Sequence, residues 1–315
     1  MKKIFYLNFI VIVIICLCIE FCSAYSYIKK YNDTGNNLNY ELKYEYKSPK
    51  FDEYIANFFS SFDERYYRST NKTSKTVLIL GCSYAMGAGL DTKQNFSSIL
   101  SSLLDYNVLN MGFGGHGISS ALNFFQNPSN VEKLNSKINS VDYVIYVYHV
   151  DHLRRLFLTN NILTGEFFTK YENIDEKLIK VRLNKMQQLF YSSFFYNNFI
   201  ANKIAKSNFL KEKESYSLFN LIIKKLKITL DEIYSNPQFI ILVVPTKYPA
   251  VINGVDSSFS EEEKKNIQKM GIQVVDASTL VDIDLKNEKY YIDDKCHPST
   301  AYWENVSLSF SKFLK

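Results

Sequence analysis

Ser83, Asp294 and His297 are the residues whose types could together perform nucleophilic catalysis. A serine hydroxyl is a weak nucleophile and needs an adjacent base. Histidine is the natural base near neutral pH, and a carboxylate can fix its tautomer and stabilise the imidazolium. Asp294 and His297 lie within the short stretch YIDDKCHPST, so one loop can deliver both side chains. We therefore expect Ser83 as the nucleophile, His297 as the base and Asp294 as its orienting partner.

Ser83 follows an apolar run in LILGCSYAMGAGL, where the run stops at Gly81. A second glycine-rich stretch, VLNMGFGGHGI, follows the next apolar run, and its glycines allow backbone N–H groups to approach a developing oxyanion closely. The surroundings of Ser83 do not match the Gly-x-Ser-x-Gly turn of α/β-hydrolases, because Ala85 occupies the last position.

The elements that must position these residues alternate between strands and helices. The predicted helices include 95–104, long patterns within 152–236, and a closing helix from His297 onwards. Strands that are continuous apolar runs indicate a parallel sheet covered on both faces, in which reactive groups sit at the carboxyl ends of strands. The predicted strands are 76–80, 106–112, 140–150, 239–245 and 271–278.

Three blocks in this order resemble the SGNH (GDSL-like) hydrolases. GCSYAMGAG resembles their first block, NMGFGG the second and DDKCH the last, and the resemblance covers roughly residues 76–315. It implies a flavodoxin-like three-layer α/β/α sandwich with a mostly parallel sheet and a helical insertion, together with ester hydrolysis or acyl transfer. It assigns Ser83 as nucleophile and first oxyanion N–H, Gly115 as second oxyanion donor, His297 as base and Asp294 as orienter.

The chain departs from the family pattern in two places. Cys82 stands where the first block has Asp, and YVYHVDHLRR contains no Asn where the third block should lie. Loss of one oxyanion donor costs roughly 100- to 1000-fold in turnover. His149 could supply an N–H to the oxyanion instead, with Asp151 and His152 as other candidates, or His149 could be a structural histidine.

Other polar residues near the blocks leave two interpretations open. His116 could line the substrate pocket. Arg154 and Arg155 could meet an anionic or sugar substrate, although exposed arginines at a helix start are the simpler interpretation.

Cysteine usage excludes a disulfide-rich scaffold and a four-cysteine zinc site, because only Cys82 and Cys296 lie beyond the first 24 residues. They flank the proposed nucleophile and base, so they either form a disulfide between the two loops or remain two small buried thiols. We expect no metal and no organic cofactor, since no further ligand cluster is visible and the glycine stretches lack a P-loop lysine.

Residues 1–24 predict a signal peptide or an N-terminal membrane anchor, with an apolar run over 4–19 after two lysines. Residues 25–75 are a polar linker and lead-in, with a helix possible over 51–67. The predicted location is therefore exported: secreted, or held at the membrane by the N-terminus. The net charge of +5 comes without a basic tract, so nucleic acid is not an expected partner.

The sequence thus predicts an exported serine esterase or O-acyltransferase that acts on ester groups, O-acetyl above all, of carbohydrate or envelope substrates. One alternative is a catalytically weak carbohydrate-binding or assembly module with the same fold, which the missing Asn favours. Another is a lipase acting at membranes, suggested by the aromatic stretch 186–205, which could equally pack on the sheet.

Overall fold

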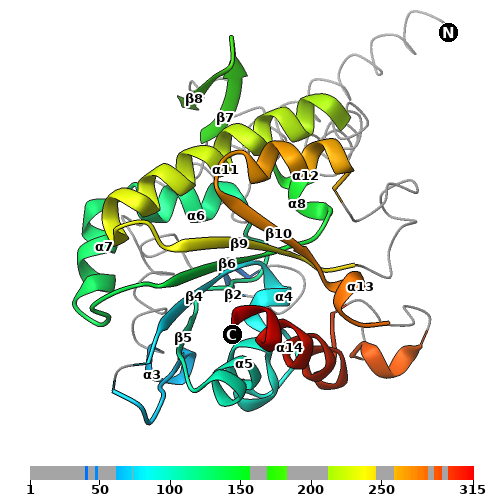
Figure 1. Ribbon diagram of the computed structural model, residues 1–315. Helices are drawn as coiled ribbons and strands as arrows, with labels where there is room; N and C mark the ends of the chain where they lie inside the picture. The colour runs from blue at the N-terminus through cyan, green and yellow to red at the C-terminus, as the bar shows by residue number, and fades with distance from the viewer. Residues whose placement is uncertain are drawn as a thin grey trace, which may run out of the picture.

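A six-stranded sheet organises the protein (Figure 1). The computed structural model describes residues 40–41, 47–48, 62–72, 74–156, 169–182, 212–245, 259–282, 287–292 and 297–315. The strands of the main sheet are β3 (Tyr66–Tyr67), β4 (Thr76–Gly81), β5 (Asn107–Asn110), β6 (Tyr143–Tyr148), β9 (Gln238–Val243) and β10 (Ile272–Asp276). Two further pairs are β1 (Tyr40–Glu41) with β2 (Lys47–Ser48), and β7 (Thr169–Ile174) with β8 (Lys177–Arg182).

The strand order in the main sheet is β10-β9-β6-β4-β5-β3. All pairs are parallel except that of β3 with β5, which is antiparallel. Numbered along the chain, the five parallel strands follow the flavodoxin-like order 2-1-3-4-5, so the predicted sandwich is confirmed. In that order the chain reverses its direction of winding between β4 and β6, and ligands bind outside the carboxyl ends of the strands at this point. The register pairs Gly81 with Val147 at this edge.

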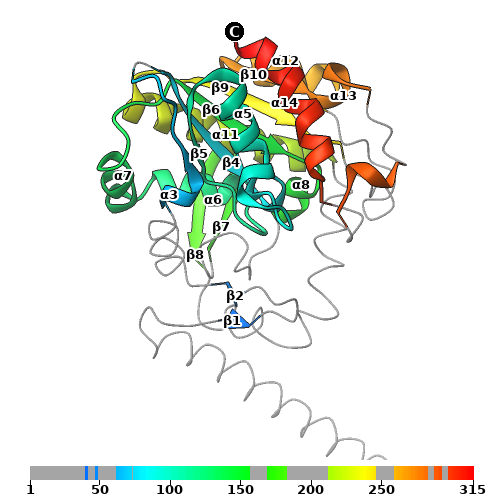
Figure 2. The same cartoon turned by 90° about the horizontal axis from the view of Figure 1, so that it is seen from below.

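Helices cover both faces of the sheet. The α-helices are α3 (Phe62–Arg65), α4 (Ser83–Met86), α5 (Phe96–Leu104), α6 (Ile118–Phe125), α7 (Pro128–Asn135), α8 (Asp151–Arg155), α11 (Glu212–Tyr234), α12 (Glu261–Gln268), α13 (Ala277–Leu280) and α14 (Thr300–Leu314). Short 3-10 helices span Thr92–Gln94 and Glu288–Tyr290. Figure 1 shows α6, α11 and α12 on one side of the strands and α5 and α14 on the other, and Figure 2 places α5 and α14 in front of them.

The two faces carry two separate cores. Because side chains alternate along a strand, Val77 and Ile79 of β4 pack with α5 and α14, while Leu78 and Leu80 pack with α6 and α11. Trp303 is fully buried in the first core. A strand that is apolar on both sides must be covered on both sides, which explains the continuous apolar runs in the sequence.

Two parts of the chain differ from the sequence predictions. The region 152–236 is not helical throughout, because β7 and β8 form an antiparallel hairpin within it. The sheet also begins before the predicted boundary at residue 76, since β3 pairs with the edge of β5. Over the described residues, the helices include none whose length and apolar character would let it cross a membrane. The predicted signal segment and the stretch 186–205 lie outside the described residues.

Candidate active site

Ser83 and His297 are joined by a hydrogen bond. The Ser83 Oγ lies 2.7 Å from the His297 Nε2, although the two residues are 214 positions apart in the chain. Ser83 opens α4 directly beyond the carboxyl end of β4, and both side chains are partly buried. A neutral imidazole with its proton on Nδ1 can accept the serine proton through Nε2 at this distance. Asp294 and Cys296 lie outside the described residues, so the role of Asp294 stays a prediction.

The turn that presents Ser83 depends on Gly81. Its φ of +143° is a conformation that side chains with a Cβ rarely adopt, and an added Cβ would lie 2.8 Å from the Val147 carbonyl oxygen. The strand can therefore stay against β6 up to the residue at which the chain turns into α4. Cys82 is the N-cap of that helix, and its sulfur accepts from the Tyr84 N–H at 3.5 Å. A capping acceptor is thus retained where the family pattern has Asp.

The glycine-rich second block packs against the Ser83 turn. The Asn110 Nδ2 donates to the Ala85 carbonyl at 2.8 Å, and the Asn110 Oδ1 accepts from the Gly112 N–H at 2.9 Å. A Cβ on Gly112 would lie 2.5 Å from the Met86 nitrogen, so only glycine fits there. Gly115, with φ +77°, lies further along the same loop. Its assignment as an oxyanion donor stays a prediction.

Arg65 holds this block through two hydrogen bonds, a role that no feature of the sequence indicated. Its Nη1 donates to the carbonyl oxygens of Asn110 and Gly112, each at 3.2 Å. Arg65 ends α3, in the region expected to be a linker. Only the antiparallel pairing of β3 with β5 brings it to the second block.

His149 lies beyond the end of β6, next to the Ser83 turn. Its ring stacks on Tyr84 with centroids 4.5 Å apart, and Tyr84 in turn meets His297 edge-on at 5.3 Å. His149 is 7% exposed. The structure thus brings this predicted oxyanion donor into the neighbourhood of the site, and its role as donor stays a prediction.

Asp151 and His152, the other candidates for the missing oxyanion donor, each make a hydrogen bond to another side chain. The Asp151 carboxylate accepts from the Arg155 Nε at 2.8 Å. The His152 Nδ1 lies 2.6 Å from the Tyr146 hydroxyl, and His152 is fully buried. Burial, reinforced by His149 and Arg155, lowers the pKa of His152 well below its usual 6.5.

His116 is buried and lines a small cavity with Gly81, Met111 and residues of α6. Burial, followed by the positive charges of Arg155 and Arg65, lowers its pKa to about 3, so the ring is neutral near pH 7. Its carbonyl accepts from the Arg155 Nη1 at 2.7 Å. A role of His116 in binding substrate stays a prediction.

One sequence expectation is wrong at this site, and one of two open alternatives is excluded. Arg155 was expected to be an exposed residue of a helix start, but only 11% of its side chain is accessible, because it bridges Asp151 and the His116 carbonyl. The Arg154 side chain is not described. Cys82 is a buried free thiol, which contradicts the disulfide with Cys296 that was one of the two alternatives.

The fold and the site together define an α/β sandwich with a serine–histidine pair beside the point where the winding of its sheet reverses. No protein-family model matches this chain, and no curated protein matches it.

Solved structures do match. One is a structure from Desulfitobacterium hafniense that is provisionally described as a lipolytic protein of the G-D-S-L family. It has 16% identity and a TM-score of 0.43, and the match covers 76% of this chain and 99% of that chain. Another is a protein provisionally described as an SGNH hydrolase from Slackia heliotrinireducens, with 12% identity and a TM-score of 0.43 over 77% and 100%. A third is a catalytic mutant of an acetylxylan esterase from Geobacillus stearothermophilus, with 13% identity and a TM-score of 0.43 over 78% and 94%. The descriptions of the first two name the G-D-S-L family and the SGNH hydrolases, and that of the third names an acetylxylan esterase.

Proposed function

We propose that the protein is an exported serine esterase or O-acyltransferase of the SGNH type, acting on O-acyl groups of carbohydrate or envelope substrates. The single observation that supports it most is the 2.7 Å hydrogen bond between Ser83 Oγ and His297 Nε2 at the carboxyl edge of the sheet. A hydroxyl in contact with an imidazole is the arrangement that activates serine as a nucleophile.

The reaction would proceed in two acyl transfers. The Ser83 Oγ attacks the ester carbonyl carbon while its proton passes to the His297 Nε2. The tetrahedral intermediate collapses, the alcohol leaves with the proton from His297, and the acyl group stays on Ser83. Water or a sugar hydroxyl then gives its proton to His297 and takes the acyl group, and His297 returns that proton to the released Ser83 Oγ. The N–H groups of Ser83 and Gly115, and the His149 side chain, are the proposed oxyanion donors.

The test uses the purified protein with a short-chain and a long-chain chromogenic ester and an acetylated oligosaccharide. We expect turnover of the short-chain and acetylated substrates, lost by at least about 1000-fold in Ser83→Ala and in His297→Ala. Ser102→Ala, an exposed serine of α5, is the matched control and should retain full turnover. Equal activity in all variants would exclude this pair as the catalytic centre, and a strong long-chain preference would favour the lipase.

Asp294 has its own test. If its carboxylate holds His297 in the tautomer that accepts from Ser83, Asp294→Asn should lower kcat by about 1000-fold or more, because an amide stabilises the wrong tautomer. Asp293→Asn is the matched control, since it removes the neighbouring charge. If Asp293→Asn is the damaging change instead, the orienting role belongs to Asp293.

A carbohydrate-binding or assembly module is the second candidate, and the absence of the third-block Asn from YVYHVDHLRR is the feature that favours it. This function predicts no turnover of any ester by the folded protein, together with measurable binding of an acetylated oligosaccharide in calorimetry.

Export rests on residues 1–24, whose two lysines and apolar run are typical of a secretory signal or an anchor. The test is to fractionate cells that express the full chain and to determine the N-terminus of the mature product. Recovery outside the cytoplasm supports export, and the N-terminus then distinguishes cleavage from anchoring. Recovery of the intact chain in the cytoplasm alone would contradict it.

A further inference from the structure

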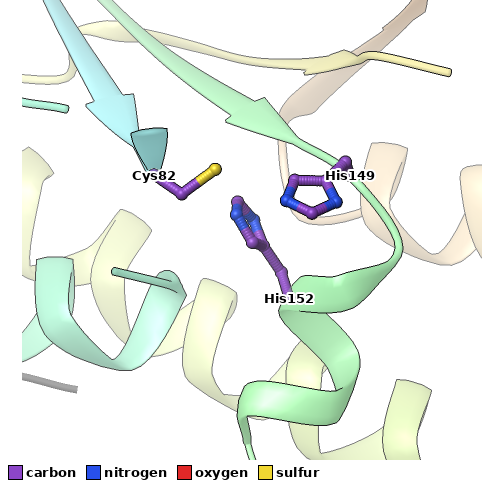
Figure 3. A group of neighbouring side chains, drawn as sticks. All are labelled: Cys82, His149 and His152. Atoms are coloured by element: carbon purple, nitrogen blue, oxygen red, sulfur yellow. The ribbon is translucent and has the colours of Figure 1, made fainter. Parts of the chain in front are cut away.

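Cys82, His149 and His152 form a buried group under the Ser83 turn (Figure 3). Each offers one ligand atom, and these atoms all lie within 4.8 Å of one another. The three residues are 0%, 7% and 0% exposed. Figure 3 shows the side chains converging from the end of β4, from the segment after β6 and from the first turn of α8. The group is separate from the Ser83–His297 pair, and none of its members is needed as nucleophile or base.

A thiolate and two imidazoles are ligands that suit Zn²⁺ and other borderline or soft transition-metal ions. Zn–S distances of about 2.3 Å and Zn–N distances of about 2.0–2.1 Å put neighbouring ligand atoms of a tetrahedral site about 3.3–3.6 Å apart. The 4.8 Å upper limit observed here therefore requires any two atoms to approach by no more than about 1.5 Å.

His152 supplies an independent sign that a ligand fits. Its Nδ1 is held by the Tyr146 hydroxyl at 2.6 Å, whereas its Nε2 is buried and has no hydrogen-bond partner among the described residues. A buried polar nitrogen without a partner is unfavourable, and a metal ion would remove that penalty. Metal-binding histidines usually have the other ring nitrogen fixed by a hydrogen bond, as the Tyr146 hydroxyl does for His152.

The charges around the group also favour a cation bound through a thiolate. Arg155 interacts with the Cys82 side chain, and the Asp151 carboxylate balances the guanidinium. With a Cys82 thiolate, these three groups carry a net charge of −1, so a divalent ion would enter an environment of opposite sign.

We propose that Cys82, His149 and His152 bind a single transition-metal ion, of which Zn²⁺ is the representative, and that the ion has a structural role. It would join the end of β4 to the segment after β6 and so hold the two strand ends that border Ser83. The proposal does not depend on the proposed esterase activity.

The first test needs no variant. The full-length protein is stripped with a chelator and then titrated with Co²⁺. We expect a thiolate-to-cobalt charge-transfer band that saturates at one ion per chain, and a higher midpoint of thermal unfolding with Zn²⁺ than without. A folded protein that shows neither the band nor the shift would overturn the proposal, whatever its esterase activity.

The second test locates the site. Cys82→Ser and His152→Gln should weaken Co²⁺ binding by at least about 100-fold, and Tyr146→Phe, which removes the hydroxyl that holds the His152 Nδ1, by about 10-fold. Cys296→Ser removes the other cysteine beyond residue 24 and should keep the band. A band that survives in Cys82→Ser, or that disappears in Cys296→Ser, would place the thiolate elsewhere and contradict the assignment.

Discussion

Tyr84 packs the edge of its ring against the imidazole of His297, with centroids 5.3 Å apart and ring planes at 63°. The Tyr84 ring also stacks on the His149 ring. Tyr84 directly follows Ser83, so one turn of the chain supplies both the hydroxyl that contacts the His297 imidazole and an aromatic ring that packs against it. This packing limits rotation of the imidazole. Tyr84 is thereby a positioning residue for the proposed base.

Replacing Tyr84 should affect kcat more than KM. Tyr84→Leu removes the aromatic contact, worth about 0.5–1.5 kcal/mol, and we expect kcat to fall about 10-fold because His297 is then less well aligned with Ser83. Tyr84→Phe keeps the ring and should retain most of the wild-type kcat. Steady-state kinetics of both variants checks this. A loss as large in Tyr84→Phe as in Tyr84→Leu would mean that the hydroxyl, and not the ring, is what matters.

Removing Arg65 should loosen the second block. Arg65→Ala leaves the carbonyl oxygens of Asn110 and Gly112 without this charged donor, so we expect the free energy of unfolding to fall by about 1–3 kcal/mol. Arg68→Ala is the matched control, since its ion pair with Asp63 is exposed and should contribute at most about 1 kcal/mol. Urea unfolding of the two variants measures the difference. Equal effects would contradict a special role for Arg65.

Acid should destabilise the protein through His116. Its pKa is about 3 in the folded state and near 6.5 in an unfolded chain, so below pH 6.5 the unfolded state binds a proton that the folded state does not. The contribution of His116 to the free energy of unfolding is therefore fully present above pH 6.5, and it is lost progressively as the pH falls towards 3. At pH 5 this one group accounts for about 2 kcal/mol.

The measurement compares the pH dependence of unfolding in wild type and in His116→Gln. From pH 7 to pH 5 the variant should lose less stability than the wild type by about 2 kcal/mol, because glutamine does not titrate. His152, also buried with a lowered pKa, acts in the same direction and remains in both proteins. Parallel pH profiles would show that His116 takes up its proton in the folded state.

The core between the sheet and α14 should be sensitive to truncation. Phe310 is fully buried, so Phe310→Ala should lower the free energy of unfolding by about 3–5 kcal/mol. Leu308→Ala on the same helix removes a side chain that is 51% exposed and should change it by less than about 1 kcal/mol. The single tryptophan, Trp303, is buried on this helix and reports unfolding by its fluorescence. Similar midpoints for the two variants would contradict the burial of Phe310.

The strands that carry the site could be predicted because each is a continuous apolar run that must be covered on both faces. The hairpin of β7 and β8 could not. Its turn uses Asp175 and Glu176, with φ of +50° and +61°, where glycine or asparagine would be the usual signal. Strand β3 has only two residues, too few for a pattern to appear.

Much of the candidate site was predictable from residue types and spacing, but the metal-binding group was not. Cys82 and His149 become neighbours only because β4 pairs in parallel with β6, in a register that aligns Gly81 with Val147. Apolar patterns predict strands without their order, so no sequence pattern links the two residues. Arg155 was misjudged for a related reason: its counter-ion and its carbonyl partner come together only in the fold.

The 214 positions that separate Ser83 from His297 make ester turnover a reporter of complete folding. No fragment that ends before residue 297 can contain both groups, and no intermediate that lacks the docked C-terminal segment can bring them into contact. During refolding from denaturant, activity should therefore return no earlier than the slowest long-range step. A partly assembled sheet would show native-like circular dichroism but no ester turnover.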